Sequence, residues 1–330
     1  MDLALKYRPK TFEDVVGQNF ITNILSKQIK TNTHKNAYLF CGAHGCGKTT
    51  CARIFSNEIN NKEEQAIEID GASNNGVDNI RALIEDAQQS SIDCDYKVYI
   101  IDEAHMITIQ GWNAALKLIE EPPLHCIFIF CTTNPEKIPN TILSRVQRFD
   151  FKKIPIDTIS NRLIYILNSE NINTFDKKAL HKISVLSNGH MRDAIKILES
   201  CLDVNTNITL DLVETLFGLV KQESIDKILA SMIDCNFEEC IAEYNHCKSM
   251  SFDGLKLYDA LFAESLQLLI DIAINNMNAH NITNYLKTQN SADITKQLKN
   301  ISNNMYETRK STNKDNADVM LQYEMIRCCQ

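Results

Sequence analysis

The sequence predicts an α/β fold followed by all-α structure: a parallel sheet with helices on both faces, then helices to the end of the chain. Two observations support this prediction. Four short runs in the first half are almost continuously apolar, at 36–42, 66–70, 97–102 and 126–133. Such runs suit strands buried on both faces of a parallel sheet, and helical patterns separate them in βαβα order. From about Ile154 only helical patterns follow.

The helices expected between the strands span 48–60, 77–90 and 111–120. In the second half a helix begins after Pro155, and 176–203 carries two more. Beyond Leu216 the chain stays helical. The polar segment 284–305 is also expected to be a helix, because its apolar residues recur at helical spacing.

The composition is that of a soluble globular protein, and 330 residues predict two or three domains. No apolar run reaches the roughly 18 residues of a membrane span, and no apolar signal core opens the chain, so a cytoplasmic protein is expected. A net charge of −8 argues against an overall basic surface that binds DNA non-specifically. It still allows a local basic surface that contacts DNA. The 12 cysteines include no C-x-x-C pair, so we expect free thiols and no zinc site.

Residues 42–49 match G-x-x-x-x-G-K-[ST] in full, between an expected strand and an expected helix. Backbone N–H groups of such a loop wrap a phosphate, and the helix N-terminus adds partial positive charge. Lys48 is expected to reach the β- and γ-phosphates of ATP, and Thr49 to join a Mg²⁺ shell. A plain strand-to-helix turn is the alternative, but it rarely needs Lys and Thr there. The predicted contacts to the nucleotide come from His44, Gly45, Cys46, Gly47, Lys48, Thr49 and Thr50.

Asp102 and Glu103 end the apolar run at 97–102 and are expected at the carboxyl edge of the sheet, beside the loop. Asp102 would orient Mg²⁺, and Glu103 would act as general base on the attacking water. A solvated acidic turn is the alternative. His105 is expected to form a hydrogen bond rather than to transfer protons. Thr133, after the last buried strand, either senses the γ-phosphate or caps a turn.

Several segments together resemble one family, the gamma/tau subunit of the bacterial clamp loader, an AAA+ ATPase of DNA polymerase III. They are "LALKYRPKTFEDVVGQ" (3–18), "EIDGASNNGVDNIR" (68–81), "VYIIDEAHMIT" (98–108), the run 111–151 and "SNGHMRDAIKILE" (187–199). The resemblance covers roughly the first 200 residues. It implies a P-loop AAA+ domain over 1–153, a helical lid domain over 154–215 and a helical collar domain for oligomerisation over 216–330.

The resemblance also implies roles that spacing alone does not give. Arg145 is similar to the arginine finger that acts on ATP in the neighbouring subunit, although composition alone favours a surface charge. Arg192, in "GHMRD", is similar to the second sensor, which reaches the γ-phosphate from the lid. Both would neutralise charge on the transferring phosphoryl group. The implied contacts to the adenine base are Tyr7, Arg8, Val15 and Val16.

As a member of this family the chain would be an ATP-driven motor that opens a sliding clamp and loads it onto primer–template DNA. The implied partners are delta- and delta-prime-like subunits, further copies of the chain in a five-membered ring, the clamp and the DNA, contacted through phosphates. Two alternatives stay open: a scaffold subunit that does not hydrolyse ATP, and another AAA+ DNA motor such as a branch-migration helicase.

The chain departs from the family pattern at two places. The family reads Ser-Arg-Cys where this chain has Val146 after Arg145. The four-cysteine zinc module is missing, because only 55–65 joins the loop helix to the second strand. The chain also stops near the end of the collar-like region, so the resemblance implies a short gamma-like form that binds Mg²⁺ through Thr49 and Asp102 and carries no zinc.

Overall fold

The computed structural model describes residues 2–62, 66–89, 94–249, 252–274, 291–313 and 315–328. The chain forms two compact units, Met1–Leu210 and Asp211–Gln330. The first unit contains the sheet and the helices that follow it, and the second is helical. The predicted division into three domains, with boundaries after residues 153 and 215, stays a prediction.

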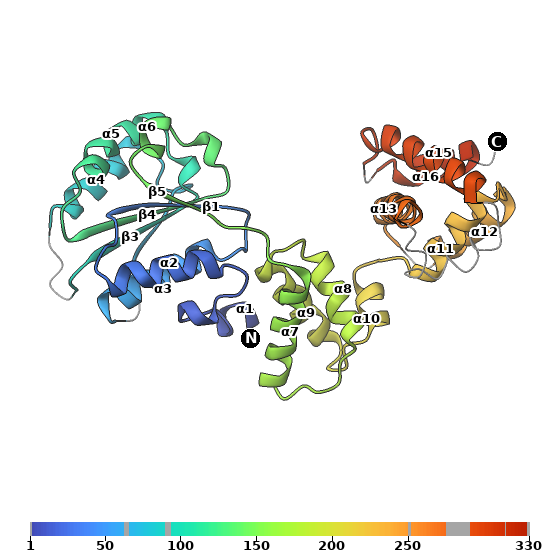
Figure 1. Cartoon of the computed structure of the whole chain (residues 1–330), viewed down its shortest axis with the longest axis horizontal. Helices are drawn as coiled ribbons and strands as arrows, with labels where there is room; N and C mark the ends of the chain where they lie inside the picture. The colour runs from blue at the N-terminus through green and yellow to red at the C-terminus, as the bar shows by residue number, and fades with distance from the viewer. Residues whose placement is uncertain are drawn as a thin grey trace. The chain divides into compact units, whose positions relative to one another are not determined.

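Five strands form one parallel sheet in the order β2-β3-β4-β1-β5 (Figure 1). They are β1 (Ala37–Cys41), β2 (Ile67–Asp70), β3 (Lys97–Asp102), β4 (Cys126–Thr132) and β5 (Gln147–Asp150). The first four fall within the predicted apolar runs, and every residue of β1 and β4 is buried. Since β3, β4 and β1 are neighbours, their carboxyl ends meet at one edge of the sheet.

The strand β5 was not among the predicted strands. It follows the short helix α6 (Asn140–Leu143). In β5, Arg148 and Asp150 are exposed while Phe149 is buried, so the continuous apolar run of a central strand is absent. Tertiary packing holds the strand in place: the ring of Phe149 lies 5.8 Å from that of Phe40 in β1.

Helices cover both faces of the sheet (Figure 1). They are α2 (Asn19–Lys30) and α3 (Lys48–Asn60) on one face, and α4 (Val77–Ala87) and α5 (Ile109–Glu120) on the other. In β1, Tyr38 and Phe40 pack toward α2 and α3, whereas Leu39 and Cys41 pack toward α4 and α5, as the alternation of a strand requires. The predicted α/β fold is confirmed.

The first unit ends in a group of packed helices: α7 (Ile156–Ser169), α8 (Lys177–Leu186) and α9 (Met191–Val204). Each contributes fully buried apolar residues, among them Leu163, Ile183 and Leu198. The short α1 (Leu3–Lys6) packs against α9, so the start of the chain lies on this helical group. The helix α10 (Leu210–Leu216) begins at the boundary between the two units.

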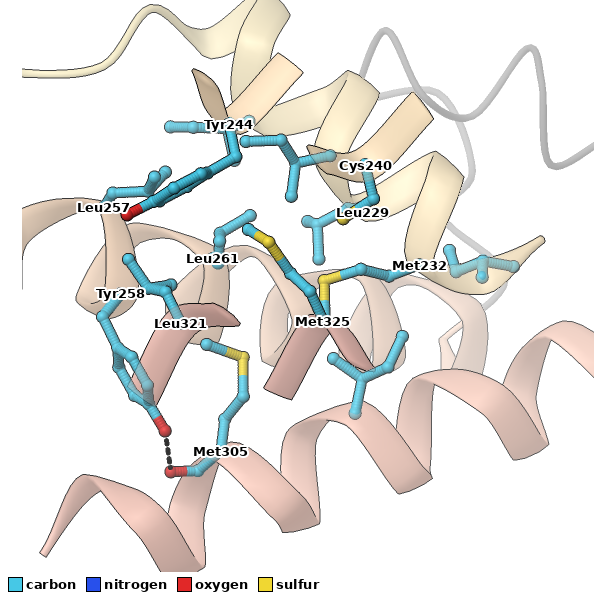
Figure 2. Packing of buried hydrophobic residues seen from close by; sticks show 14 of the residues in the cluster. Leu229, Met232, Cys240, Tyr244, Leu257, Tyr258, Leu261, Met305, Leu321 and Met325 are labelled. Carbon is cyan, nitrogen blue, oxygen red and sulfur yellow. Dashed lines mark hydrogen bonds between the residues drawn. The ribbon is translucent and has the colours of Figure 1, made fainter. Parts of the chain in front are cut away.

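The described helices that follow α10 surround one apolar core (Figure 2). They are α11 (Gln222–Ile233), α12 (Phe237–Ser249), α13 (Gly254–Ala273), α15 (Ser291–Arg309) and α16 (Ala317–Cys328). The hydroxyl of Tyr258 in α13 donates to the carbonyl oxygen of Met305 in α15 at 3.0 Å. The predicted helical character is confirmed here. Of the polar segment 284–305, residues 291–305 lie in α15, and 284–290 lie outside the described residues.

Glu324 of α16 is a carboxylate inside this core. It is 1% exposed, and Nη1 of Arg327 lies 3.9 Å from its Oε1 atom. Burial raises the pKa of Glu324, although Thr308 and Arg327 favour the charged form. The folded state therefore favours the protonated carboxyl, and the stability that Glu324 contributes is present at acid pH and lost as the pH rises through its folded-state pKa.

We therefore expect Glu324→Gln to stabilise the second unit at pH 7.5 by about 1 kcal/mol, because it removes a buried charge and keeps the polar shape. The gain should shrink near pH 4, where the wild-type carboxyl is protonated. Hydrogen exchange of peptides from α13 and α16, compared between variant and wild type at each pH, measures this. Glu238→Gln, at an exposed position of α12, is the control. An equal gain at both pH values would contradict the account.

Candidate active site

The segment from Gly42 to Gly47 turns from β1 into α3. Gly42, Gly45 and Gly47 have positive φ values of 148°, 67° and 104°. A Cβ atom at Gly42 would lie 2.5 Å from the carbonyl oxygen of Phe151, so both space and backbone conformation require glycine there. Because α3 begins at Lys48, its first N–H groups are free to bind an anion at this edge of the sheet.

Lys48 is buried next to the loop. Its ammonium donates to the carbonyl oxygens of Gly42 at 2.8 Å and Ala43 at 2.9 Å. An ammonium has three N–H donors, so Lys48 can bind a phosphate oxygen beside these two carbonyls. The loop thus combines a fixed cation with free backbone donors.

The hydroxyl of Thr49 donates to Oδ2 of Asp102 at 2.7 Å. Thr49 is the second residue of α3 and Asp102 the last residue of β3, so the fold joins two motifs that lie 53 positions apart. Mg²⁺ in nucleotide sites takes a hydroxyl and one or two carboxylates together with substrate phosphates. This pair fits that pattern. Within the described residues, no group of three or more His, Cys, Asp or Glu side chains could hold a metal ion.

Glu103 follows β3 in the left-handed conformation, with φ 46° and ψ 41°. A non-glycine residue rarely adopts this conformation, and such backbone strain is frequent at functional sites. Oε1 of Glu103 lies 3.5 Å from Nδ1 of His44, and Oε2 lies 3.3 Å from Nδ1 of His105. The carboxylate is therefore placed between the phosphate loop and the turn Ala104–Met106.

A cavity of about 310 Å³ opens beside this carboxylate. It is lined by the ends of β2 and β3, through Glu68, Ile69, Asp70, Ile100, Asp102 and Glu103. Four of these side chains are carboxylates, so the cavity is acidic and disfavours an anion.

The end of β4 lies next to β1 and β3. Thr132 is fully buried, and its hydroxyl lies 3.2 Å from Nδ1 of His105. Thr133, the predicted sensor, donates from its hydroxyl to Oδ1 of Asn134 at 2.8 Å. Thr133 is thus at the predicted edge of the sheet, where a hydroxyl can meet a water or a phosphate.

The N-terminal segment, which carries the residues expected at the base, contacts both α3 and α7. Tyr7 donates from its hydroxyl to Glu170, while Arg162 of α7 donates to the carbonyl oxygen of Tyr7 at 3.1 Å. Nε of Arg8 donates to the hydroxyl of Thr50 at 3.3 Å, which places this guanidinium beside the start of α3. Burial lowers the pKa of Arg8. Val15 is buried and Val16 is half-buried.

Gln18 was not among the predicted site residues. Its Nε2 atom donates to the carbonyl oxygens of Lys152 at 2.7 Å and Cys46 at 3.3 Å, and Oε1 accepts from the N–H of Lys152. Gln18 thereby ties the phosphate loop to the segment that leads into α7. The only sequence signal for Gln18 was its position in segment 3–18, one of the segments that resemble the gamma/tau family.

Arg192 is the second residue of α9 and lies against the phosphate loop. The N–H of Met191 donates to the carbonyl oxygen of Gly45 at 3.2 Å, and a Cβ atom at Gly45 would lie 3.4 Å from Cβ of Arg192. The structure therefore brings Arg192 next to the loop; its role as second sensor stays a prediction.

Arg145 has different neighbours. Its Nη2 lies 2.5 Å from Oε1 of Glu120, and Nη1 donates to the carbonyl oxygen of Thr141 at 2.6 Å and to Ser144. These partners belong to α5 and to the α6 region, not to the phosphate loop. Arg145 is about one-third exposed, so it is accessible from outside the chain.

Three cysteines lie near the loop and are buried: Cys41, Cys46 and Cys51. Burial raises the pKa of Cys41 to about 11 and of Cys51 to about 12, and it also raises the pKa of Cys46. These thiols stay protonated at neutral pH, so they pack in the core and are poor nucleophiles.

Comparison with solved structures shows the fold. The RuvB Holliday junction branch migration motor of Thermotoga maritima matches with a TM-score of 0.55 at 20% sequence identity. The match covers 69% of this chain and 80% of that chain. At this identity the likeness shows the fold alone.

Comparison with known sequences is more specific. The family model described as "DNA polymerase III, delta subunit" matches residues 66–155. DNA polymerase III subunit gamma of Buchnera aphidicola is 35% identical over 294 residues, which cover 82% of this chain and 78% of that protein. DNA polymerase III subunit tau of Bacillus subtilis is 38% identical over 276 residues, 77% of this chain.

The chain spans about half the length of several of these relatives, 49% in the case of the Bacillus subtilis tau subunit. In the described part of the chain, no helix combines the length and the apolar character that crossing a membrane requires.

Proposed function

Because this chain belongs to the gamma/tau family of DNA polymerase III subunits, we propose that it is an ATPase, the motor subunit of a clamp loader. In this role it opens a sliding clamp and loads it onto primer–template DNA. The observation that carries the proposal is the hydrogen bond from Thr49 to Asp102, with Glu103 beside it. A scaffold that only binds nucleotide would not need all three side chains at one edge.

The nucleotide is ATP, bound with Mg²⁺. Backbone donors from His44 to Thr50 and the ammonium of Lys48 bind the phosphates, while Thr49 and Asp102 hold the metal. Bound Mg²⁺ neutralises charge on the phosphate oxygens. Tyr7, Arg8, Val15 and Val16 form the base side of the site.

Glu103 accepts the proton of the attacking water as its oxygen bonds to the γ-phosphorus; the bond from that phosphorus to the bridging β-phosphate oxygen breaks, and ADP leaves. Thr133 orients the water or the γ-phosphate through its hydroxyl. Arg192 donates to the phosphate from α9, and Arg145 donates to the ATP of the neighbouring subunit. Because Arg145 acts between subunits, hydrolysis depends on an assembled ring.

The proposed partners are delta- and delta-prime-like subunits, further copies of this chain in a five-membered ring, the sliding clamp and primer–template DNA. The helical region from 216 joins the subunits. DNA contacts are with phosphates, so binding falls steeply with salt. The complex works in the cytoplasm.

The metal assignment predicts that Thr49→Ala weakens binding of a fluorescent ATP analogue about tenfold or more in Mg²⁺. In EDTA the variant and the wild type should bind alike, because the hydroxyl then has no ion to hold. Titration under both conditions measures this, with Thr31→Ala, at an exposed helix end, as the control. Equal weakening in Mg²⁺ and EDTA would contradict the assignment.

The loader role is tested by retention of labelled clamp on primed circular DNA after incubation with the reconstituted ring. Retention that requires ATP and primed DNA supports the proposal. Retention that needs no hydrolysis by this chain would favour the scaffold. Branch migration of junction DNA without clamp retention would favour a different AAA+ motor.

A further inference from the structure

One nitrogen atom, Nδ1 of His105, lies within reach of two partners. It is 3.3 Å from Oε2 of Glu103 and 3.2 Å from Oγ1 of Thr132. The side chain of His105 is 11% exposed and belongs to the turn Ala104–Met106, so it is held in place between them.

Whether Nδ1 carries a hydrogen decides which of its two partners this nitrogen binds. In a neutral imidazole Nδ1 either carries a hydrogen or offers a lone pair. With a hydrogen, Nδ1 donates to the Glu103 carboxylate and fixes its direction. Without one, Nδ1 accepts the hydroxyl hydrogen of Thr132, and its lone pair repels the carboxylate. The tautomer of His105 therefore sets where Glu103 points.

Thr132 connects this pair to the rest of the site. Its hydroxyl oxygen accepts the N–H of Asn134 at 3.1 Å, next to Thr133. Its carbonyl oxygen accepts the N–H of Gly42, the first residue of the phosphate loop, at 3.1 Å. Thr132 is buried and contacts His105. A movement of the phosphate loop or of the turn after β4 that shifts Thr132 therefore also changes its contact with His105.

We propose that His105 is a positioning residue for Glu103, and that Thr132 couples this positioning to the phosphate loop and to the end of β4. The inference rests on the proposed function, because it requires Glu103 to accept a proton from the attacking water. His105 itself transfers no proton. His44, on the other side of the carboxylate, is 74% exposed, so water screens its contact with Glu103.

The test compares His105→Ala, His105→Gln and His105→Asn in the full chain, reconstituted with its ring partners. An asparagine amide occupies the place of Nδ1, whereas a glutamine amide occupies that of Nε2. We expect kcat to fall about 10- to 100-fold in the alanine and glutamine variants and to recover in the asparagine variant. The Kd for ATP should stay within about twofold, because the interaction acts on the transition state.

Thr132→Val removes the hydroxyl that competes with Glu103 for Nδ1 of His105, so it should raise kcat, and it should change little when added to His105→Ala, because Thr132 acts on Glu103 through His105. His181→Ala, at an exposed position of α8, is the control for loss of an imidazole. Thermal unfolding of each variant detects a folding defect.

Different results would overturn the proposed function and the positioning role of His105. No turnover by wild type and by Glu103→Gln alike would overturn both. Turnover that requires Glu103 but is unchanged in His105→Ala would overturn the positioning role alone. So would a His105→Asn variant as slow as the alanine variant, or a kcat loss matched by an equal loss of ATP affinity.

Discussion

Replacing Glu103 with glutamine should lower ATP turnover by about 100- to 10,000-fold, the usual contribution of a general base. Glutamine keeps the size and the hydrogen-bonding shape of the side chain but cannot accept the proton of the attacking water. ATP binding should persist, because the groups proposed to bind the phosphates, namely Lys48, Thr49 and the loop backbone, are unchanged in this variant. Single-turnover hydrolysis and equilibrium binding of a fluorescent ATP analogue, measured side by side, check both parts.

The matched control is Glu68→Gln. Glu68 lines the same cavity but lies on β2 and pairs with Arg53. It should retain most of the turnover. Glu103 is not the general base if the Glu103→Gln variant hydrolyses ATP at the wild-type rate. The same conclusion follows if the Glu68→Gln variant is equally impaired.

Replacing Arg145 with alanine should lower turnover of the assembled ring roughly 1,000-fold or more, the usual effect of removing an arginine finger. The isolated chain should lose little, because Arg145 there contacts Glu120 and Thr141 and not its own phosphate loop. Arg148→Ala is the control, since Arg148 is an exposed arginine of β5 that pairs with Asp150.

Mixed rings test whether Arg145 acts between subunits. A Lys48→Ala chain has an impaired nucleotide site and an intact Arg145, while an Arg145→Ala chain has the reverse. Neither should turn over ATP alone with the partner subunits, and a mixture should recover part of the activity. A mixture as inactive as its components would place Arg145 outside the neighbour's site.

The position of the glycine-rich loop between a strand and a helix could be predicted because its motif lies within eight consecutive residues, from Gly42 to Thr49. Asp102 and Glu103 could be predicted for a second reason. A buried strand of a parallel sheet ends at the same edge as its neighbours, so residues at strand ends come together whatever their distance in sequence.

Contacts between distant polar residues of ordinary type could not be predicted. Tyr7 with Glu170 and Gln18 with Lys152 join the N-terminal segment to the region around α7 across more than 130 positions, and no spacing pattern marks them. The same holds for Thr132 and His105, which belong to different strand ends. The strand β5 was missed because it is short, charged and defined by its pairing with β1.

Steady-state ATP turnover of this chain, reconstituted with the proposed delta- and delta-prime-like partners, tests the central claim most directly. The measurement is made with and without sliding clamp and primed DNA. Strong stimulation by clamp and primed DNA together, abolished by Glu103→Gln, is the result that a clamp-loader motor predicts. An ATP turnover rate that changes with neither clamp nor primed DNA would contradict this role. The chain would then be an ATPase with a different function.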